Sequence, residues 1–299
     1  MRLAAIDIGS NAARLLISDV TLNNHKPEFN KLNLFRVPLR LGFDVFERKE
    51  ISPEKIEMIV NTLQAFKYMT EAYSVKYLKA AATSAMRDAN NTEDVLLRVR
   101  RETGIDIEVI SGGDEASFIY ENHIAEELDK NHSYLYIDVG GGSTELTFFA
   151  ETKLIFKESF NIGTIRLLKN QVVDKQWNDM KDFIKKETKG HDNDLIAIGS
   201  GGNINKVFSL SKRKDGKPLT LDLLKEYHKE LGSFSVRDRM RLYSLKEDRA
   251  DVIVPALQIY INVMRWANTE EIYVPKIGLA DGLIQHLYEE LIRKGVKIS

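Results

Sequence analysis

The chain has no cysteine among its 299 residues, which excludes disulfide bonds, thiolate metal sites and a cysteine nucleophile. It also lacks an excess of charge of either sign, because 43 lysines and arginines stand against 44 aspartates and glutamates, for a net charge of -1. A nearly neutral protein exerts no general attraction on nucleic acids or anionic membranes, so we expect neither partner. If the ligand is a polyanion, its attraction must come from a local arrangement of residues.

Long apolar runs are absent as well, and no stretch reaches the length needed to span a bilayer. The apolar segment 1–17 is interrupted by Asp7 and Arg14, and no cleavage-type segment follows it. We therefore predict a cytoplasmic protein. The length favours two domains, and no low-complexity linker separates them.

A glycine-rich turn between two apolar strands is the most informative stretch of the sequence. The first strand ends in Asp138, the turn contains Gly141, Gly142 and Ser143, and the second strand carries Glu145. Glycines let backbone N–H groups approach a bound anion, but the aspartate would repel phosphate unless a cation lay between them. The stretch therefore indicates a site for phosphate and a divalent metal. An ordinary hairpin with a loose loop is the alternative.

The amino-terminal segment repeats this pattern. Ile6–Gly9 matches Ile137–Gly140, and seven positions after the aspartate comes Arg14 in one copy and Glu145 in the other. The repeat predicts two similar half-domains that each contribute a strand, a turn and a strand to one site, with chance similarity as the alternative. By the same logic Asp7 is a candidate metal ligand.

A third glycine turn follows the predicted strand 194–199 and opens a helix. Gly201 and Gly202 lie at the start of that helix, whose unpaired N–H groups and dipole favour an anion. One such turn is a weak signal, but this is the third in the chain. We therefore expect Gly201 and Gly202 to contact phosphate.

Two charged residues near predicted helix starts have both a functional and a structural interpretation. Arg87 follows a strand that ends near Ala82, so it could reach an anion or lie on the surface. Glu115 lies in the first turn of a helix, where an acidic side chain either compensates the helix dipole or is held between the two halves to orient a water molecule.

The remaining pattern predicts an α/β rhythm. Strands are expected at 27–38, 106–110, 154–160 and 272–274, and helices at 92–103, 172–189, 221–231, 236–243 and from Gly278 to about 294. Ser52 and Pro53 start another helix, and a long helix from Glu247 should kink at Pro255. We place the domain boundary in a helix near 115–128. The domains are then 1–118 and 119–299, with the terminal helix able to pack back on the first.

Taken together, these motifs resemble those of the exopolyphosphatase/guanosine pentaphosphate phosphatase (Ppx/GppA) family, in the actin-like, Hsp70 and sugar-kinase superfamily. The resemblance covers nearly the whole chain. The motifs that carry it are Ala5–Asn11 with Arg14, Arg40–Gly42, Ala82–Arg87, Ile110–Gly112 with Glu115, Ile137–Leu146, Gly163 with Arg166, Gly199–Gly202 and Asp251–Pro255.

The resemblance implies two ribonuclease-H-like α/β domains, each with a central mixed sheet, flanking a cleft. It implies removal of the terminal phosphate from polyphosphate, or of the 5′ phosphate from guanosine pentaphosphate, with Mg²⁺ or Mn²⁺, by a homodimer. Phosphoryl transfer of this kind needs charge neutralisation and an in-line water rather than covalent help.

Carried over by position, Glu115 matches the family's catalytic glutamate, which acts as a base or orients water. Asp138 and Glu145 match its metal-linked acids. The positions that match phosphate contacts are Ser10, Asn11, Arg14, Arg87, Gly141, Gly142 and Ser143.

The chain departs from the family pattern at Ala12, Asn203–Ile204, Lys276 and Ala280. These changes affect substrate contacts more than Glu115 or Asp138. The chain also lacks the extra helical domains of long members, which favours short polyphosphate or a nucleotide as substrate. Two alternatives remain: a kinase of the same superfamily, and a polyphosphate- or nucleotide-binding sensor with little turnover.

Overall fold

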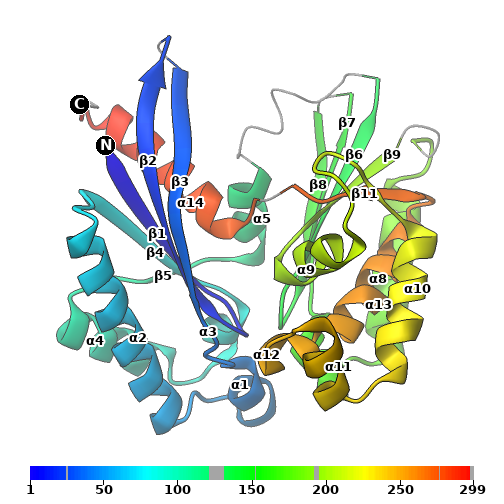
Figure 1. Ribbon diagram of the computed structural model, residues 1–299, viewed down its shortest axis with the longest axis horizontal. Helices are drawn as coiled ribbons and strands as arrows, with labels where there is room; N and C mark the ends of the chain where they lie inside the picture. Colours follow the sequence, from blue (N-terminus) through cyan, green and yellow to red (C-terminus); the bar gives the residue numbers. More distant parts are fainter. Residues whose placement is uncertain (25, 121–130, 152, 192–194, 276, 297–299) are drawn as a thin grey trace. The chain divides into compact units, whose positions relative to one another are not determined.

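The computed structural model describes residues 1–24, 26–120, 131–151, 153–191, 195–275 and 277–296. The chain forms two compact units, Met1–Asn122 together with Gly278–Ser299, and His123–Ile277. Each unit contains one mixed β-sheet flanked by helices (Figure 1), which confirms the predicted fold class. The predicted domains met at 118/119. The structure groups the terminal segment with the first unit, and part of the predicted boundary helix lies outside the described residues.

The first unit is built on a five-stranded sheet in the order β3-β2-β1-β4-β5. Its strands are β1 (Arg2–Ile8), β2 (Ala13–Asn23), β3 (Lys26–Val37), β4 (Tyr77–Ala82) and β5 (Glu108–Val109). The first three strands form an antiparallel meander, and β4 and β5 run parallel to β1. The central strand β1 is buried along nearly its whole length, as expected for a strand covered on both faces.

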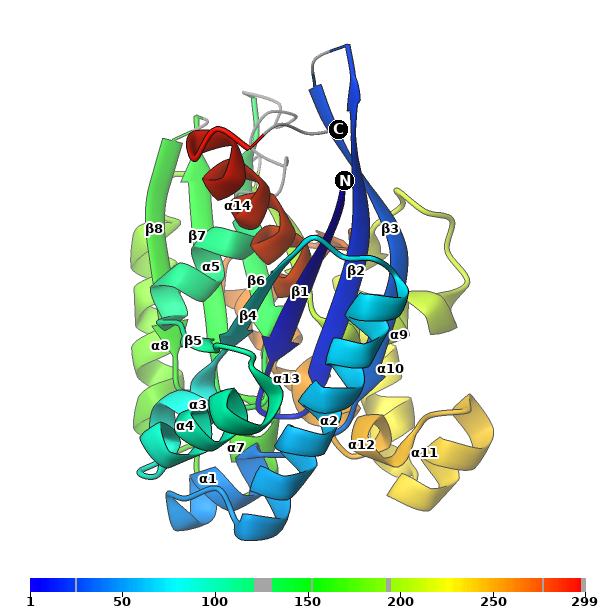
Figure 2. The same cartoon turned by 90° about the vertical axis from the view of Figure 1, so that its left-hand side faces the viewer.

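Helices cover both faces of this sheet (Figures 1 and 2). They are α1 (Gly42–Arg48), α2 (Pro53–Ala72), α3 (Ser84–Asp88), α4 (Thr92–Thr103), α5 (Gly112–Tyr120) and α14 (Leu279–Arg293). Helices α2 and α4 pack together on one face, and α14 packs on β1, β4 and α5 on the other. The predicted start of α2 is confirmed, because Ser52 Oγ accepts a hydrogen bond from Lys55 N and Pro53 is the first helical residue.

The second unit is built on a six-stranded sheet in the order β10-β11-β9-β6-β7-β8. Its strands are β6 (Ser133–Val139), β7 (Thr144–Ala150), β8 (Lys153–Phe160), β9 (Leu195–Ser200), β10 (Leu219–Thr220) and β11 (Glu271–Tyr273). The β6–β7–β8 meander corresponds to β1–β2–β3, and β9 lies parallel to β6 as β4 lies parallel to β1. The duplication predicted from two short motifs therefore extends to strand order and direction.

The helices of the second unit are α7 (Thr164–Leu168), α8 (Asp174–Glu187), α9 (Gly202–Ser211), α10 (Leu221–Ser233), α11 (Val236–Tyr243), α12 (Glu247–Ala250) and α13 (Ile253–Trp266). The predicted long helix with a kink at Pro255 is wrong. Helix α12 ends before α13 begins, and Pro255 lies in the first turn of α13. There its missing N–H costs nothing, because first-turn N–H groups have no intrahelical acceptor.

Across the described ranges, no helix is both long and apolar enough to cross a membrane.

Ion pairs fix the terminal helix α14 to the first sheet. Lys31 Nζ on β3 lies 2.6 Å from Asp281 Oδ1, and Lys79 Nζ on β4 lies 3.1 Å from Glu290 Oε1. His286 Nε2 lies 2.8 Å from the same Glu290 oxygen. Partial burial by itself would raise the pKa of the Glu290 carboxyl, but the contacts with Lys79 and His286 outweigh it and lower that pKa below the ordinary 4.5.

A carboxyl whose pKa is lowered by folding stabilises the protein above its unfolded-state pKa, and that contribution is lost as the pH falls through the folded-state value. Between about pH 5 and about pH 3, the free energy of unfolding should therefore fall less in Glu290→Gln than in the wild type. Urea unfolding at each pH measures it. Glu289→Gln is the control, because Glu289 contacts Gln285 rather than a cation. An unchanged pH dependence in Glu290→Gln would contradict the prediction.

Candidate active site

In the first unit, the buried Asp7 and the partly exposed Arg14 form an ion pair at the end of β1 and the start of β2. They are directly opposite in the antiparallel register, and Arg14 Nη1 donates to Asp7 Oδ2 at 2.6 Å. This charge-assisted bond offsets the loss of hydration of the buried carboxylate. The structure thus places the candidate metal ligand Asp7 against the candidate phosphate ligand Arg14, and the carboxylate orients the guanidinium.

The turn between these strands holds Ser10 and Asn11 in place. Ser10 Oγ lies 2.8 Å from Ser84 Oγ at the start of α3. Gly42 N donates to Ser10 O at 2.8 Å, and Arg40 N donates to Asn11 O at 2.9 Å. The motif at 40–42 therefore supports the turn through its backbone, which prepares Ser10 and Asn11 to meet a ligand without reordering.

Arg87 and Glu115 meet in the same unit. Arg87 Nη1 donates to Ile110 O at 2.7 Å and lies 3.5 Å from Glu115 Oε2. Glu115 is only 8% exposed, so its carboxylate is held within the protein rather than dissolved in water. The surface-arginine alternative for Arg87 does not describe this arrangement, because the guanidinium bridges a backbone carbonyl and a buried acid.

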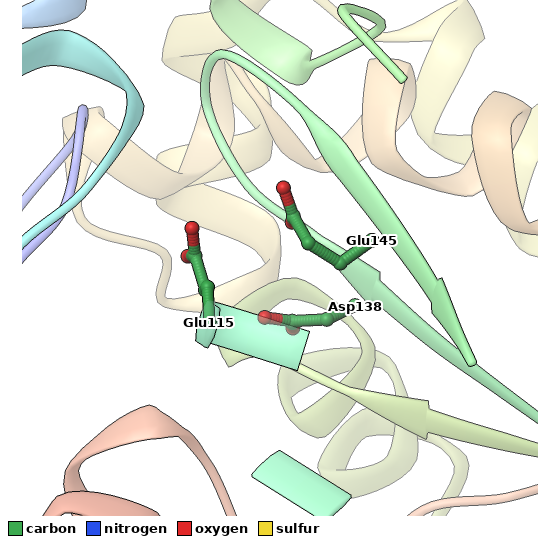
Figure 3. Close-up of side chains that lie close together, drawn as sticks. All are labelled: Glu115, Asp138 and Glu145. Atoms are coloured by element: carbon green, nitrogen blue, oxygen red, sulfur yellow. The ribbon is translucent and has the colours of Figure 1, made fainter. Parts of the chain in front are cut away.

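In the second unit, Asp138 and Glu145 lie directly opposite each other on β6 and β7 (Figure 3). Glu145 is 2% exposed, and its Oε1 accepts a hydrogen bond from Ser159 Oγ at 3.0 Å. Two facing carboxylates repel each other, and a cation between or beside them removes the repulsion. Carboxylate oxygens are the ligands that Mg²⁺ and Mn²⁺ prefer, so this pair could hold a divalent cation.

The glycine turn that joins these strands is clamped by the segment 162–166. A Cβ on Gly163 would lie 2.4 Å from Gly141 O, so this position requires glycine. Arg166 Nε donates to Gly142 O at 2.7 Å, and backbone N–H groups of the same segment donate to other carbonyls of the turn. These carbonyls are occupied by the protein, so the turn can offer N–H groups to an anion rather than negative oxygens.

The third glycine turn, between β9 and α9, lies against Asp138. Gly201 has a φ of 100°, and a Cβ there would come within 2.9 Å of Asp138 Oδ1. Beneath the turn, Tyr260 Oη donates to Ser200 O at 2.5 Å. Burial, together with the nearby charge of Asp138, raises the pKa of the Tyr260 hydroxyl well above its usual value, so the hydroxyl stays protonated and keeps donating.

Arg249 is a further candidate site residue, which the sequence interpretation missed. A Cβ on Gly202 would lie 2.6 Å from Arg249 Nη2, so the guanidinium covers the first turn of α9. Arg249 Nη1 also donates to Asn203 Oδ1 at 2.8 Å. Asn203, one of the departures from the family pattern, thus orients this arginine. The available signal was a basic residue two positions before the matched motif at Asp251.

The structure therefore gathers the candidate residues in two groups, one in each unit. The first unit holds Asp7, Ser10, Asn11, Arg14, Arg87 and Glu115. The second holds Asp138, Gly141, Gly142, Ser143, Glu145, Gly201 and Gly202, with Arg249 added. Positive charge prevails among the phosphate candidates of the first group, and the facing acid pair belongs to the second.

The model of the Ppx/GppA phosphatase family matches residues 23–291. The chain belongs to this family.

Among its curated relatives is exopolyphosphatase 1 of Mycobacterium tuberculosis, which is 26% identical over 95% of this chain and 87% of the relative. The bifunctional 3-dehydroquinate synthase/phosphatase of Fusobacterium nucleatum is 29% identical over 91% of this chain, but the match spans 44% of that protein. The guanosine-5′-triphosphate,3′-diphosphate pyrophosphatase of Vibrio parahaemolyticus is 23% identical over 98% of this chain and 61% of its own length.

Solved structures of this family are similar to the chain over nearly its whole length. The exopolyphosphatase from Cytophaga hutchinsonii superposes with a TM-score of 0.79 at 25% identity, covering 99% of each chain. The Ppx/GppA family member from Aquifex aeolicus gives a TM-score of 0.73 at 26% identity, covering 97% of this chain and 98% of its own.

The departures from the Ppx/GppA pattern have different structural settings. Ala12 and Ala280 are buried, and Ala280 lies on the face of α14 that packs into the core of the first unit. Ile204 is fully buried in the core of the second unit. Lys276 lies outside the described residues.

The position of Arg249 over the α9 turn leads to a binding prediction. Replacing Arg249→Ala should weaken the binding of tripolyphosphate by about 10- to 100-fold, because a hydrogen bond to a charged group contributes about 1.5–3 kcal/mol. Isothermal titration calorimetry measures the affinity. Arg241→Ala on the exposed helix α11 is the control, since that side chain is 77% exposed. Equal affinities of the two variants would remove Arg249 from the site.

Proposed function

We propose that the protein is a metal-dependent phosphoanhydride hydrolase. Its substrate is inorganic polyphosphate, from which it releases the terminal phosphate, or guanosine pentaphosphate, from which it releases the 5′ phosphate. The observation that carries the proposal is the direct opposition of Asp138 and Glu145 across a clamped glycine turn, which combines a cation site and an anion site in one hairpin. Membership in a phosphatase family and relatives named for these two activities support it. The proposal also retains the predictions that the protein is cytoplasmic and forms a homodimer.

Glu115 is the residue that acts on the nucleophile. Its carboxylate aligns a water molecule and accepts a proton as the water oxygen attacks the terminal phosphorus in line. The bond from phosphorus to the bridging oxygen breaks, and its electron pair leaves with the shortened chain.

The other candidate residues bind the substrate and neutralise its negative charge. Asp138 and Glu145 would hold the divalent cation, which would neutralise phosphate charge when bound. Arg14 and Arg87 each have a fixed carboxylate or carbonyl partner, so both are oriented before a substrate arrives. Arginine forks match phosphate oxygens, and the backbone N–H groups of the glycine turns add further donors. Preorganised donors of this kind stabilise the charge that develops in the transition state.

Removing the carboxylate of Glu115 should stop turnover. We expect Glu115→Gln to lower kcat by about 10²- to 10⁴-fold, the range for a general base, with little change in stability. Phosphate release is measured with short and long polyphosphate, guanosine pentaphosphate and ATP. Asp114→Asn, on the preceding exposed residue of α5, is the control.

Three outcomes of this substrate panel would contradict the proposal. Full activity of Glu115→Gln would remove that residue from its role. Tight polyphosphate binding by the wild type without phosphate release over hours would indicate a sensor. Phosphorylation of an acceptor by ATP, without free phosphate, would indicate a kinase.

The acid pair should be needed for the metal. Asp138→Asn is expected to weaken Mn²⁺ binding by about tenfold or more, because one of two facing carboxylates loses its charge. Titration calorimetry with Mn²⁺ measures this without turnover, and removal of the metal by EDTA should abolish wild-type activity reversibly. The exposed Asp222→Asn on α10 serves as the control. Unchanged Mn²⁺ affinity in Asp138→Asn would place the metal elsewhere.

A further inference from the structure

Helices α14 and α5 touch through their backbones at Gly282. A Cβ built on Gly282 would lie 1.8 Å from Phe118 O, 2.3 Å from Phe118 C and 2.9 Å from Phe118 Cα. Both helices belong to the first unit, so the contact is internal to it.

Such a contact cannot absorb even one methyl group by moving a side chain. The atoms in the way are backbone atoms of α5, and real Cβ atoms do not approach other atoms closer than 3.0 Å. An alanine at 282 therefore requires the two helices to separate by about 1 Å, because packed helices meet through their surfaces and have no spare volume between them.

Helix α14 is the fixed partner in this contact. It is joined to the sheet by the Lys31–Asp281 and Lys79–Glu290 ion pairs and packs its buried face against β1 and β4. Its connection to α5 is reinforced by His286, whose ring meets the Phe118 ring edge to face at 4.9 Å between centroids. Because α14 is held by the sheet, a larger residue at 282 displaces α5 rather than α14.

Glu115 lies on α5, one turn before Phe118. Its neighbour Arg87 comes from α3 and is tied to Ile110 O, so Arg87 does not move with α5. The 3.5 Å separation of Arg87 Nη1 and Glu115 Oε2 therefore depends on where α14 holds α5. A displacement near 1 Å at a reacting group costs about 10²-fold in rate.

We propose that Gly282 is a positioning residue for Glu115. The absence of a side chain at 282 lets α5 pack close to α14, and this distance determines the position of the Glu115 carboxylate. The proposal rests on the proposed hydrolase function. The atoms that a Cβ at Gly282 would meet first belong to the Phe118 backbone, so we expect a substitution there to change turnover rather than substrate binding.

The test is Gly282→Ala, with Gly278→Ala as its matched control. Gly278 caps the same helix, has an extended φ of -164° and has nothing within 4 Å of its hypothetical Cβ. We expect Gly282→Ala to lower kcat about 10- to 100-fold with KM unchanged, at a temperature well below its unfolding midpoint. Hydrogen exchange of the α5 amides should rise in Gly282→Ala and stay at the wild-type level in Gly278→Ala.

A second variant covers the case in which Gly282→Ala does not fold. His286→Ala removes the ring that holds Phe118 without adding bulk, and it should also lower kcat at constant KM. Glu289→Gln is its control and should keep the wild-type kcat, because the Glu289 side chain contacts Gln285 on the same helix rather than Lys79 or His286.

The outcomes separate the two proposals. Suppose that the wild type is active and Glu115→Gln is not. A wild-type kcat in Gly282→Ala then overturns the positioning role but not the hydrolase function. If Gly282→Ala does not fold, a wild-type kcat in His286→Ala decides in the same way. If kcat of Gly282→Ala stays at the wild-type value and its KM rises by the factor by which kcat/KM falls, the substitution affects binding alone. That result also overturns the positioning role. A wild type that hydrolyses none of the phosphoanhydrides overturns the hydrolase, and the positioning role with it.

Discussion

Repulsion between two carboxylates is the constraint from which the candidate site follows. Asp138 and Glu145 face each other across adjacent strands, an arrangement that costs stability in an empty hairpin. The surrounding structure maintains it: Ser159 holds one acid, and the clamp at Gly163 keeps the connecting turn in a single shape. The divalent cation of the proposed function would remove this repulsion, which fits the general observation that unfavourable local arrangements gather at functional sites.

The two copies of the repeat solve the same geometric problem with opposite charges. In each, an aspartate at the end of the first strand faces the residue seven positions later. In the first copy that residue is Arg14 and the pair is neutral, so the strand end offers a guanidinium. In the second it is Glu145 and the pair is negative. Under the proposed function, a duplicated strand–turn–strand thus provides the phosphate ligand Arg14 in one unit and the acid pair for the cation in the other, in the same pairing register.

The parts of the site that follow from local sequence were predictable, and those that depend on distant contacts were not. The glycine turns and their aspartates are contiguous motifs, so their residues and even the Asp138–Glu145 pairing follow from spacing. Arg249 reaches Gly202 from another helix, and the contact of Gly282 with Phe118 joins segments that are far apart in the sequence. The kink expected at Pro255 failed for a different reason: the helix is already interrupted between α12 and α13, and proline in the first turn of α13 is neutral.

The return of the chain to the first unit has a consequence for synthesis on the ribosome. All of His123–Ile277 emerges before α14, whose Leu283 and Ile284 complete the core against β1. The second unit can therefore fold while the first still exposes an apolar sheet face, the kind of surface that recruits chaperones or aggregates. Nascent-chain length, rather than contact energy alone, decides when Glu115 first acquires its supporting helix.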